Sequence, residues 1–463
     1  MKLLNRFFEA LFQRSTYQPG LDKDLSDQEI QQLHLQGVLS HLNFCLNHPM
    51  QVADKYETLR ENFPDIAYHP QVDNPQYLKY VRLLYPEMER RGDWQEGISY
   101  LKLAINNRKA KEDLLESYRW LSLFHSYIAD YEQAITFAQK GIELAQILRD
   151  NLSLTLVMNH LARVYRSRGD YARAIRYYEE VIQIARQNNN DEELAHSYGS
   201  KGLTYWHLKE FENALGDLQS AQEMFIKLNN KRRVGHTFNN MGLVYTDLGL
   251  HSPALFHFEK ALAIAEKRDD KREFALIEGN IGTVYFFLKQ YDTALAYLKR
   301  TMRTMDELQN NYRLAKSKAR IALIYQNMQP DTVPRDIALQ YSKEAYEIGL
   351  RYQIIHFEII GASYQAIILK DMNRINEAML LSRKAVELLG TAKGFDGVEE
   401  EIYFNHYLIL KEIDLVEAVF YLKKSQKEVQ TKLEKMTNPD FQRSFLNIEL
   451  HQRILGEIEK WTS

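Results

Sequence analysis

The sequence predicts an all-α solenoid of eight to nine helix pairs with a helical cap at each end. The main observation is a small residue that returns every 40 positions and continues toward the C-terminus after one shift of four: Ala134, Ala174, Ala214, Ala254, Ala294, Ala338, Ala378 and Ala418. A chain of 463 residues also exceeds the size, about 250–300 residues, at which one hydrophobic core stops growing. Stacked repeats avoid this limit because each repeat packs only on its neighbours. The low content of helix breakers, 10 Pro and 20 Gly, fits a helical chain.

One repeat, residues 154–188, illustrates the pattern. Apolar residues recur at spacings of three and four on both sides of a turn that contains Gly169 and Asp170. This spacing predicts two amphipathic helices that form a hairpin. Small residues let the two helices approach closely, and a Tyr three positions after the first small residue fills the space between repeats. The residues of this pattern are Leu161, Ala162, Tyr165, Ala174, Ile175, Tyr178 and Val181.

The same register, carried along the chain, places every helix. The first pair, at 78–91 and 94–107, is degenerate, and Gly97 takes the place of the periodic Ala. We expect a longer turn at 329–334, where two prolines accompany the four-residue insertion. The further pairs are expected at 114–129 and 131–149, 153–168 and 171–188, 191–208 and 211–229, 231–248 and 251–268, 271–288 and 291–309, 311–328 and 335–351, 354–371 and 375–390, and 398–411 and 414–432.

The repeated pattern resembles the tetratricopeptide repeat. In one repeat it consists of Gly202, Tyr205 three positions later, Phe211 six later, Ala214 three later and Ala221 seven beyond. The resemblance covers roughly residues 78–432 and implies a right-handed superhelix. The usual period is about 34, whereas here it is 40, and the customary terminal proline is missing. Such longer repeats are similar to those of Pins-type polarity adaptors, kinesin light chains, Rap-type peptide-sensing regulators and the helical arms of signalling ATPases.

The two ends fall outside the repeat register. We predict an N-terminal helical cap region at 1–70, the solenoid at 71–432 and a C-terminal capping helix at 433–463, because the ends of a solenoid expose a hydrophobic face. Met1–Arg14 carries an apolar stripe, which favours docking on the first repeat. A partner-binding or membrane-surface helix is the alternative. The C-terminal segment also resembles the last part of the repeat arms in signalling ATPases.

Composition and motifs argue against several function classes. The sequence lacks phosphate-binding and dinucleotide-binding loops, metalloprotease motifs and nucleophile elbows, so we expect no enzyme activity and no cofactor. The single cysteine, Cys45, excludes a thiolate metal site, and we expect no bound metal. The net charge of −3 gives no general attraction to nucleic acid, although residues 163–176 hold five arginines. No apolar run approaches 18 residues and no signal peptide is present, so we expect a cytoplasmic protein that does not bind membranes.

In tetratricopeptide proteins the first helix of each pair lines a concave face, and the resemblance selects the residues expected there. In related adaptors an Asn at such a position clamps the backbone of an extended peptide, which the resemblance implies for Asn239, Asn240 and Asn280. A carboxamide suits this role because it both donates and accepts hydrogen bonds. The alternative is that these side chains bridge neighbouring helices. The predicted partner-binding residues are Asn159, His160, Arg163, Arg166, His196, Trp206, His236, Asn239, Asn240, Asn280, Phe286 and Arg320.

The predicted function is a non-enzymatic scaffold or sensor that binds a partner protein segment or peptide in this concave groove. Arg163 and Arg166 would bind a carboxylate or phosphate, and an exposed Trp206 beside Arg and Asn has hot-spot composition. The alternative, from the C-terminal resemblance, is a regulatory subunit that holds an enzyme such as a protease or ATPase inactive, or targets it. An enzyme of the Rap type would place its key residues in an N-terminal bundle, and residues 1–70 carry no matching motif.

Overall fold

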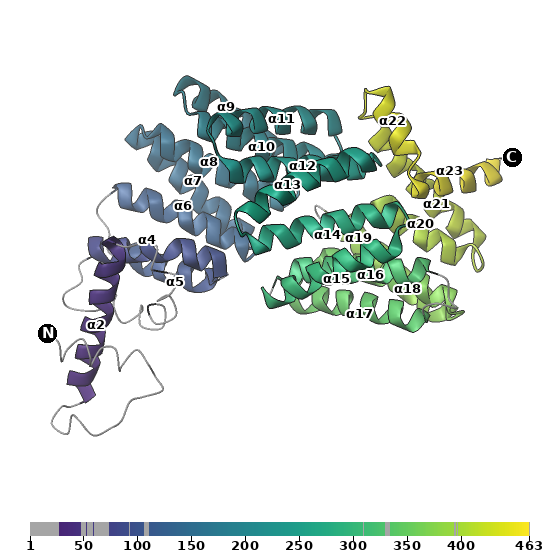
Figure 1. Cartoon of the computed structure of the whole chain (residues 1–463), viewed down its shortest axis with the longest axis horizontal. Helices are drawn as coiled ribbons and strands as arrows, with labels where there is room; N and C mark the ends of the chain where they lie inside the picture. Colours follow the sequence, from purple (N-terminus) through teal and green to yellow (C-terminus); the bar gives the residue numbers. More distant parts are fainter. Residues whose placement is uncertain are drawn as a thin grey trace. The chain divides into compact units, whose positions relative to one another are not determined.

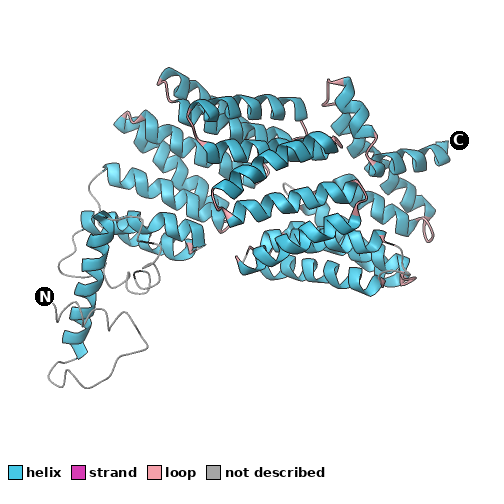
Figure 2. Cartoon of the chain, in the orientation of Figure 1, coloured by secondary structure: helices cyan, strands magenta, loops and turns pink. Residues whose placement is uncertain are grey.

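The structure is helical, without strands, throughout the residues that it describes (Figures 1 and 2). It is a computed structural model that describes residues 27–47, 52, 59, 74–91, 93–105, 111–308, 310–328, 334–392, 395 and 397–462. Met1–Arg14 and the insertion at 329–333 therefore lie outside the described residues. None of the described helices combines the length and apolar composition that a membrane span needs.

The helices follow one another in pairs, in the predicted order. α2 (Asp27–Asn47) comes first, and α22 (Pro439–Leu446) and α23 (Glu449–Thr462) come last. The pairs between them are α4 (Asn74–Arg91) and α5 (Trp94–Ile105), α6 (Lys111–Tyr127) and α7 (Tyr131–Leu148), α8 (Asn151–Ser167) and α9 (Tyr171–Gln187), α10 (Asp191–His207) and α11 (Phe211–Lys227), α12 (Lys231–Asp247) and α13 (His251–Lys267), α14 (Lys271–Phe287) and α15 (Tyr291–Glu307), α16 (Asn311–Asn327) and α17 (Arg335–Tyr352), α18 (Ile355–Asp371) and α19 (Ile375–Thr391), and α20 (Glu399–Leu410) and α21 (Leu415–Leu433).

The C-terminal segment differs from the prediction, because two helices stand where we expected one. Two side chains of α23 bind the last carbonyl groups of α22. His451 Nδ1 lies 2.6 Å from the Phe445 carbonyl oxygen, and Gln452 Nε2 donates to the Leu446 carbonyl oxygen at 2.7 Å. These side chains replace the backbone N–H groups that would continue the helix.

Left-handed backbone conformations mark the turns within helix pairs and the turns between successive pairs. Residues with positive φ recur every 20 positions over five repeats, and each stands two residues after the last residue of a helix, or directly after it at Arg149. A residue in this conformation ends a helix and lets the following N–H bind back to a helical carbonyl. The series is Ala129, Arg149, Gly169, Asn189, Lys209, Asn229, Gly249, Asp269 and Lys289.

The chain divides into two compact units, which we describe separately. Unit 1 ends at Val164 and unit 2 begins at Tyr165, so the boundary falls within α8. In unit 1, α2 packs against α4, and the Tyr80 hydroxyl donates to Asn43 Oδ1 at 2.8 Å. The buried core of this unit includes Val38, Leu42, Tyr85 and Phe124.

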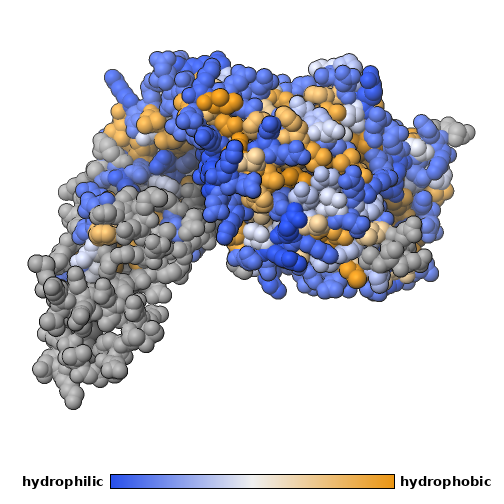
Figure 3. All heavy atoms as spheres, viewed as in Figure 1, coloured by the Kyte–Doolittle hydropathy of each residue, from blue (hydrophilic) through white to orange (hydrophobic). Residues whose placement is uncertain are grey.

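In unit 2 the first helices of successive pairs contact one another. α10, α12, α14, α16, α18 and α20 form such a series, and each pair also packs through its second helix on the next pair. This arrangement places the first helices on the inner side of a curved stack. On the face seen in Figure 3, hydrophobic residues lie in groups between hydrophilic ones.

Candidate partner-binding surfaces

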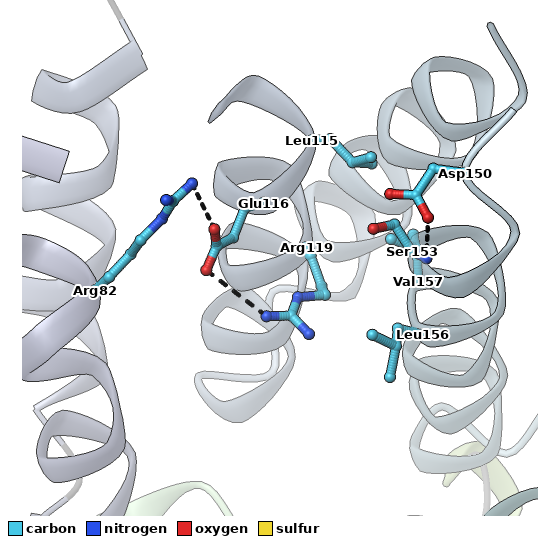
Figure 4. Close-up of a pocket in the computed structure, with 8 residues that line it drawn as sticks. All are labelled: Arg82, Leu115, Glu116, Arg119, Asp150, Ser153, Leu156 and Val157. Atoms are coloured by element: carbon cyan, nitrogen blue, oxygen red, sulfur yellow. Dashed lines mark hydrogen bonds and ion pairs between the residues drawn. The ribbon is translucent and has the colours of Figure 1, made fainter. Parts of the chain in front are cut away.

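A pocket of about 320 Å³ opens on the first helices of unit 1. α4, α6 and α8, together with the turn that precedes α8, supply its walls (Figure 4). It combines charged groups with apolar side chains. This composition suits a ligand group that has a charged end and an apolar part. The lining residues are Arg82, Leu115, Glu116, Arg119, Asp150, Ser153, Leu156 and Val157.

The charged groups of the pocket are unequally paired. Arg82 Nη2 lies 2.5 Å from Glu116 Oε2 and 3.1 Å from Asp113 Oδ1. The other oxygen of Glu116 lies 3.9 Å from Arg119 Nη2, so Arg119 is held more weakly than Arg82 (Figure 4). Asp150 accepts a hydrogen bond from the backbone N–H of Ser153 at 3.0 Å. Burial opposes the charge on Asp150, but this capping of α8 lowers its pKa.

Buried donors without partners lie on the same three helices. Among the described residues, the structure gives no hydrogen-bond acceptor to Arg82 Nε, Trp120 Nε1 or Arg163 Nη2, and no partner to His160 Nδ1. The Arg163 guanidinium lies over the Tyr127 ring, 5.5 Å from its centroid. Burial, aided by the charges of Arg163 and Arg119, lowers the pKa of His160 well below its ordinary value, so this ring is neutral. Unsatisfied buried donors are rare in folded proteins.

In unit 2 two of the predicted asparagines bind each other. Asn280 Nδ2 on α14 donates to Asn239 Oδ1 on α12 at 2.8 Å, and Asn239 Nδ2 approaches Asn240 Oδ1 at 3.4 Å. The side chains of Asn239 and Asn280 are only 9% and 5% exposed, whereas Asn240 is half-buried. These amides therefore bridge two neighbouring first helices, and their role as a peptide clamp stays a prediction.

Comparison with protein families and solved structures identifies the repeats. The model of the tetratricopeptide repeat family matches residues 113–187 and 191–267. These two stretches are tetratricopeptide repeats. No curated protein sequence matches this chain.

Three solved structures have the same repeat fold. The Rap protein complexed with competence and sporulation factor is 14% identical, with a TM-score of 0.56, over 79% of this chain and 100% of that one. The quorum sensor NprR from B. thuringiensis is 16% identical, with a TM-score of 0.54, over 77% and 98%. Aspartyl phosphate phosphatase F from Bacillus subtilis is 14% identical, with a TM-score of 0.52, over 82% and 98%. At these identities the likeness concerns the fold alone.

The repeat register holds a signal for Arg82 and Arg119, two pocket residues that are not among the predicted partner-binding residues. Arg119 stands 40 residues before Asn159, and Arg82 stands 37 residues before Arg119, which is also the interval from Gly97 to Ala134. Both arginines thus occupy the position of Asn159 in earlier repeats. The signal is present in the sequence, but the predicted partner-binding residues begin only at the repeat that contains Asn159.

Several other predicted residues of the tetratricopeptide-repeat solenoid already have partners within unit 2. Trp206 Nε1 donates to Asp247 Oδ2 at 3.0 Å, and Lys209 binds the same oxygen at 2.8 Å. Arg166 Nη1 donates to the Ser200 carbonyl oxygen at 3.3 Å. Arg163 and Arg166 make different contacts, and their joint binding of an anion stays a prediction.

The remaining predicted residues are half-buried. His236 Nε2 lies 3.2 Å from Glu273 Oε1, and the Arg320 guanidinium covers the Phe286 ring at 5.0 Å from its centroid. His196 meets the Phe225 ring edge-on, and burial, followed by the charge of Arg233, lowers its pKa to about 4. Asn159 is also half-buried. Among the described residues no group of acidic, His or Cys side chains is placed to hold a metal ion.

We expect the variant Asn280→Ala to lower the free energy of unfolding by about 1–3 kcal/mol, because it leaves Oδ1 of the Asn239 side chain buried without a donor. Urea denaturation followed by circular dichroism measures this loss. The double variant Asn239→Ala/Asn280→Ala removes both amides and should cost less than the sum of the two single variants. Additive losses would contradict a direct bond between the two side chains.

Proposed function

We propose that this repeat protein is a non-enzymatic scaffold or sensor that binds an acidic segment of a partner protein on the first helices of unit 1. The observation that carries the proposal is the pocket on α4, α6 and α8 with its weakly held Arg119. Its lining residue Arg82 has a buried Nε without an acceptor, and further unpaired buried donors lie on α6 and α8. Unsatisfied donors cost about 1–3 kcal/mol each, and a ligand that supplies acceptor oxygens reduces that cost.

The pocket suits a carboxylate on an apolar stem. Arg119 presents a planar guanidinium that can bind two carboxylate oxygens at once, and its ion pair with Glu116 in the pocket is long, at 3.9 Å. Leu115, Leu156 and Val157 provide the apolar wall for the stem. The volume lies at the lower end of the range for ligand sites, about 300–1,000 Å³, so it suits one or two side chains of a peptide.

The rigid stack reduces the cost of binding an extended segment, because the helices that carry the contacts are ordered before the partner arrives. Of the three similar structures, one is described as a complex with a competence and sporulation factor and one as a quorum sensor. These descriptions agree with a sensor or scaffold role for this chain. The proposed partner is a protein or peptide, and the proposal includes no nucleic acid, membrane or cofactor.

We expect full-length protein to select peptides rich in Asp or Glu from a random displayed library. The variant Arg119→Ala should weaken their binding roughly tenfold or more, because hydrogen bonds to charged groups contribute about 1.5–3 kcal/mol. Fluorescence anisotropy with the selected peptides measures the change in Kd.

Arg176→Ala is the matched control for this experiment. It removes the same charge from α9, where the Arg176 side chain is largely exposed and lies 3.5 Å from Glu180. If both variants weakened peptide binding equally, the loss would come from the change in net charge. That result would contradict binding of the peptide in the pocket. A partner protein captured equally by wild type and Arg119→Ala would instead favour a regulatory subunit that holds its enzyme through another surface.

A further inference from the structure

The C-terminal helix α22 packs on a part of unit 2 that precedes it by more than 200 residues. The buried ring of Phe445 lies 6.4 Å from that of Phe211 at the start of α11. Ile448, in the turn between α22 and α23, covers Gly249 in the turn between α12 and α13. A Cβ atom on Gly249 would lie 2.9 Å from Ile448 Cγ1 and 3.2 Å from the Ser444 carbonyl oxygen. α22 (yellow in Figure 1) thereby joins the last repeat of unit 2 to the edge formed by α10–α13.

Polar contacts fix the direction of α22 on this edge. Glu212 Oε1 accepts hydrogen bonds from the backbone N–H groups of Thr437 and Asn438, at 2.8 and 2.9 Å, just before α22 begins. Lys435 Nζ donates to the Leu208 carbonyl oxygen at 2.8 Å, at the C-terminal end of α10. Both contacts complement helix ends, since a carboxylate suits an N-terminus and a cation suits a C-terminus. Lys289 and Glu449 form an exposed ion pair at 3.1 Å.

α22 is held less firmly than its neighbour α23. Phe445 is the one buried side chain of α22. Apart from the buried contact of its carbonyl oxygen with His451, the polar contacts that join α22 and its flanking residues to earlier repeats are mostly exposed. α23 instead carries Ile454, which is fully buried, and His451, which binds the buried Glu400 of α20 at 3.2 Å. A segment with few buried contacts and exposed hydrogen bonds opens at a lower free energy than the core around it.

From this contrast we propose that α22 is an intramolecular clasp that opens while the repeats stay folded, and that the edge beneath it is a docking site for a partner helix. The present occupant defines the chemistry of that partner. It is a short amphipathic helix with free N-terminal N–H groups for Glu212 and an aromatic side chain for the site beside Phe211. An acidic residue after the helix meets Lys289. The inference is independent of the acidic-peptide pocket in unit 1.

Hydrogen exchange of the full-length protein, followed by mass spectrometry, tests the opening. We expect the amides of α22 to exchange at least about tenfold faster than those of α14, because only local opening is required. The variant Gly249→Asn should increase exchange in α22 and in the turn at 208–212, since its side chain displaces Ile448. Exchange of α22 at the rate of α14 in the wild type would overturn the clasp.

Gly169→Asn is the matched control, because Gly169 has the same left-handed backbone (φ +83° against +74°) at the equivalent turn two repeats earlier. It should leave exchange in α22 unchanged, and an equal effect of both variants would overturn the proposal. A labelled peptide of residues 434–450 tests the docking site. It should bind the variant Phe445→Ala more tightly than wild type, and the further substitution Glu212→Ala should abolish that difference. Equal binding to wild type and Phe445→Ala would also overturn it.

Discussion

Replacing Phe258 with alanine should lower the free energy of unfolding by about 3–5 kcal/mol, the usual cost of removing a fully buried Phe. The Phe258 ring on α13 is 0% exposed and belongs to a cluster with Ala254, Ala261 and Ile281. It also fills the space over Gly242, where a Cβ atom would lie 2.5 Å from the ring. Since Gly242 has no side chain to move into the gap, the cavity would remain open. Urea denaturation followed by circular dichroism gives the loss.

The control is Phe256→Ala, two residues away on the same helix. Phe256 is 54% exposed, so its removal should change stability by no more than about 0.5 kcal/mol. Hydrogen exchange adds a spatial test, because repeats depend on their neighbours: Phe258→Ala should deprotect α12–α15 before α18–α21. Similar losses for the two variants would show that the packing around α13 differs from the one described.

Phe258 and Gly242 also illustrate what the sequence predicts well. The 40-residue register places a small residue on each first helix opposite a large residue on the second, and it locates each helix of the repeats to within four residues; the largest difference is the start of α4, at Asn74 instead of 78. Such contacts join neighbours along the chain, so every repeat displays them again. Periodicity therefore reports the packing within and between adjacent repeats.

Contacts between distant segments leave no such signal. Glu212 reads as an ordinary surface residue near the start of a second helix, yet it binds the N-terminus of α22 more than 220 residues later. The sequence offers the hydrogen bond from Asn280 to Asn239 only as an alternative to the peptide clamp. Each of these interactions occurs once, and a repeat pattern carries no information about a single event.

The run Glu399–Glu401 is the clearest example. From the sequence alone, this run is explained by the favourable interaction of acidic residues with the start of a helix. In the structure its middle member, Glu400, is buried and binds Lys432 of α21 and His451 of α23. Lys432 Nζ also lies 3.0 Å from Glu399, and the Tyr364 hydroxyl donates to Glu401 at 3.1 Å. The buried group therefore fastens α23 to the last repeat.

We expect Lys432→Met to lower the free energy of unfolding by about 3–5 kcal/mol, because it leaves the Glu400 carboxylate buried without its cation. The double variant Glu400→Gln/Lys432→Met removes both charges and should recover a large part of this loss. Arg374→Met is the control, since the pair of Arg374 and Glu377 at 2.7 Å is exposed and should contribute nothing measurable. A double variant as unstable as Lys432→Met would mean that the loss comes from packing of the lysine stem.

The same pair sets a pH dependence. Burial alone would raise the pKa of Glu400, but Lys432 and His451 lower it to about 2, below the ordinary value of 4.5. The stabilisation is therefore fully present above pH 4.5 and is lost as the pH falls through about 2. Burial opposes the charge on Lys432, yet Glu400 and Glu399 raise its pKa, so its contribution is complete below the ordinary value of 10.5 and disappears only at higher pH. Wild type should thus lose stability relative to Glu400→Gln/Lys432→Met as the pH is lowered from 4.5 toward 2. Parallel stability curves of the two proteins over this range would mean that Glu400 keeps its ordinary pKa in the folded chain.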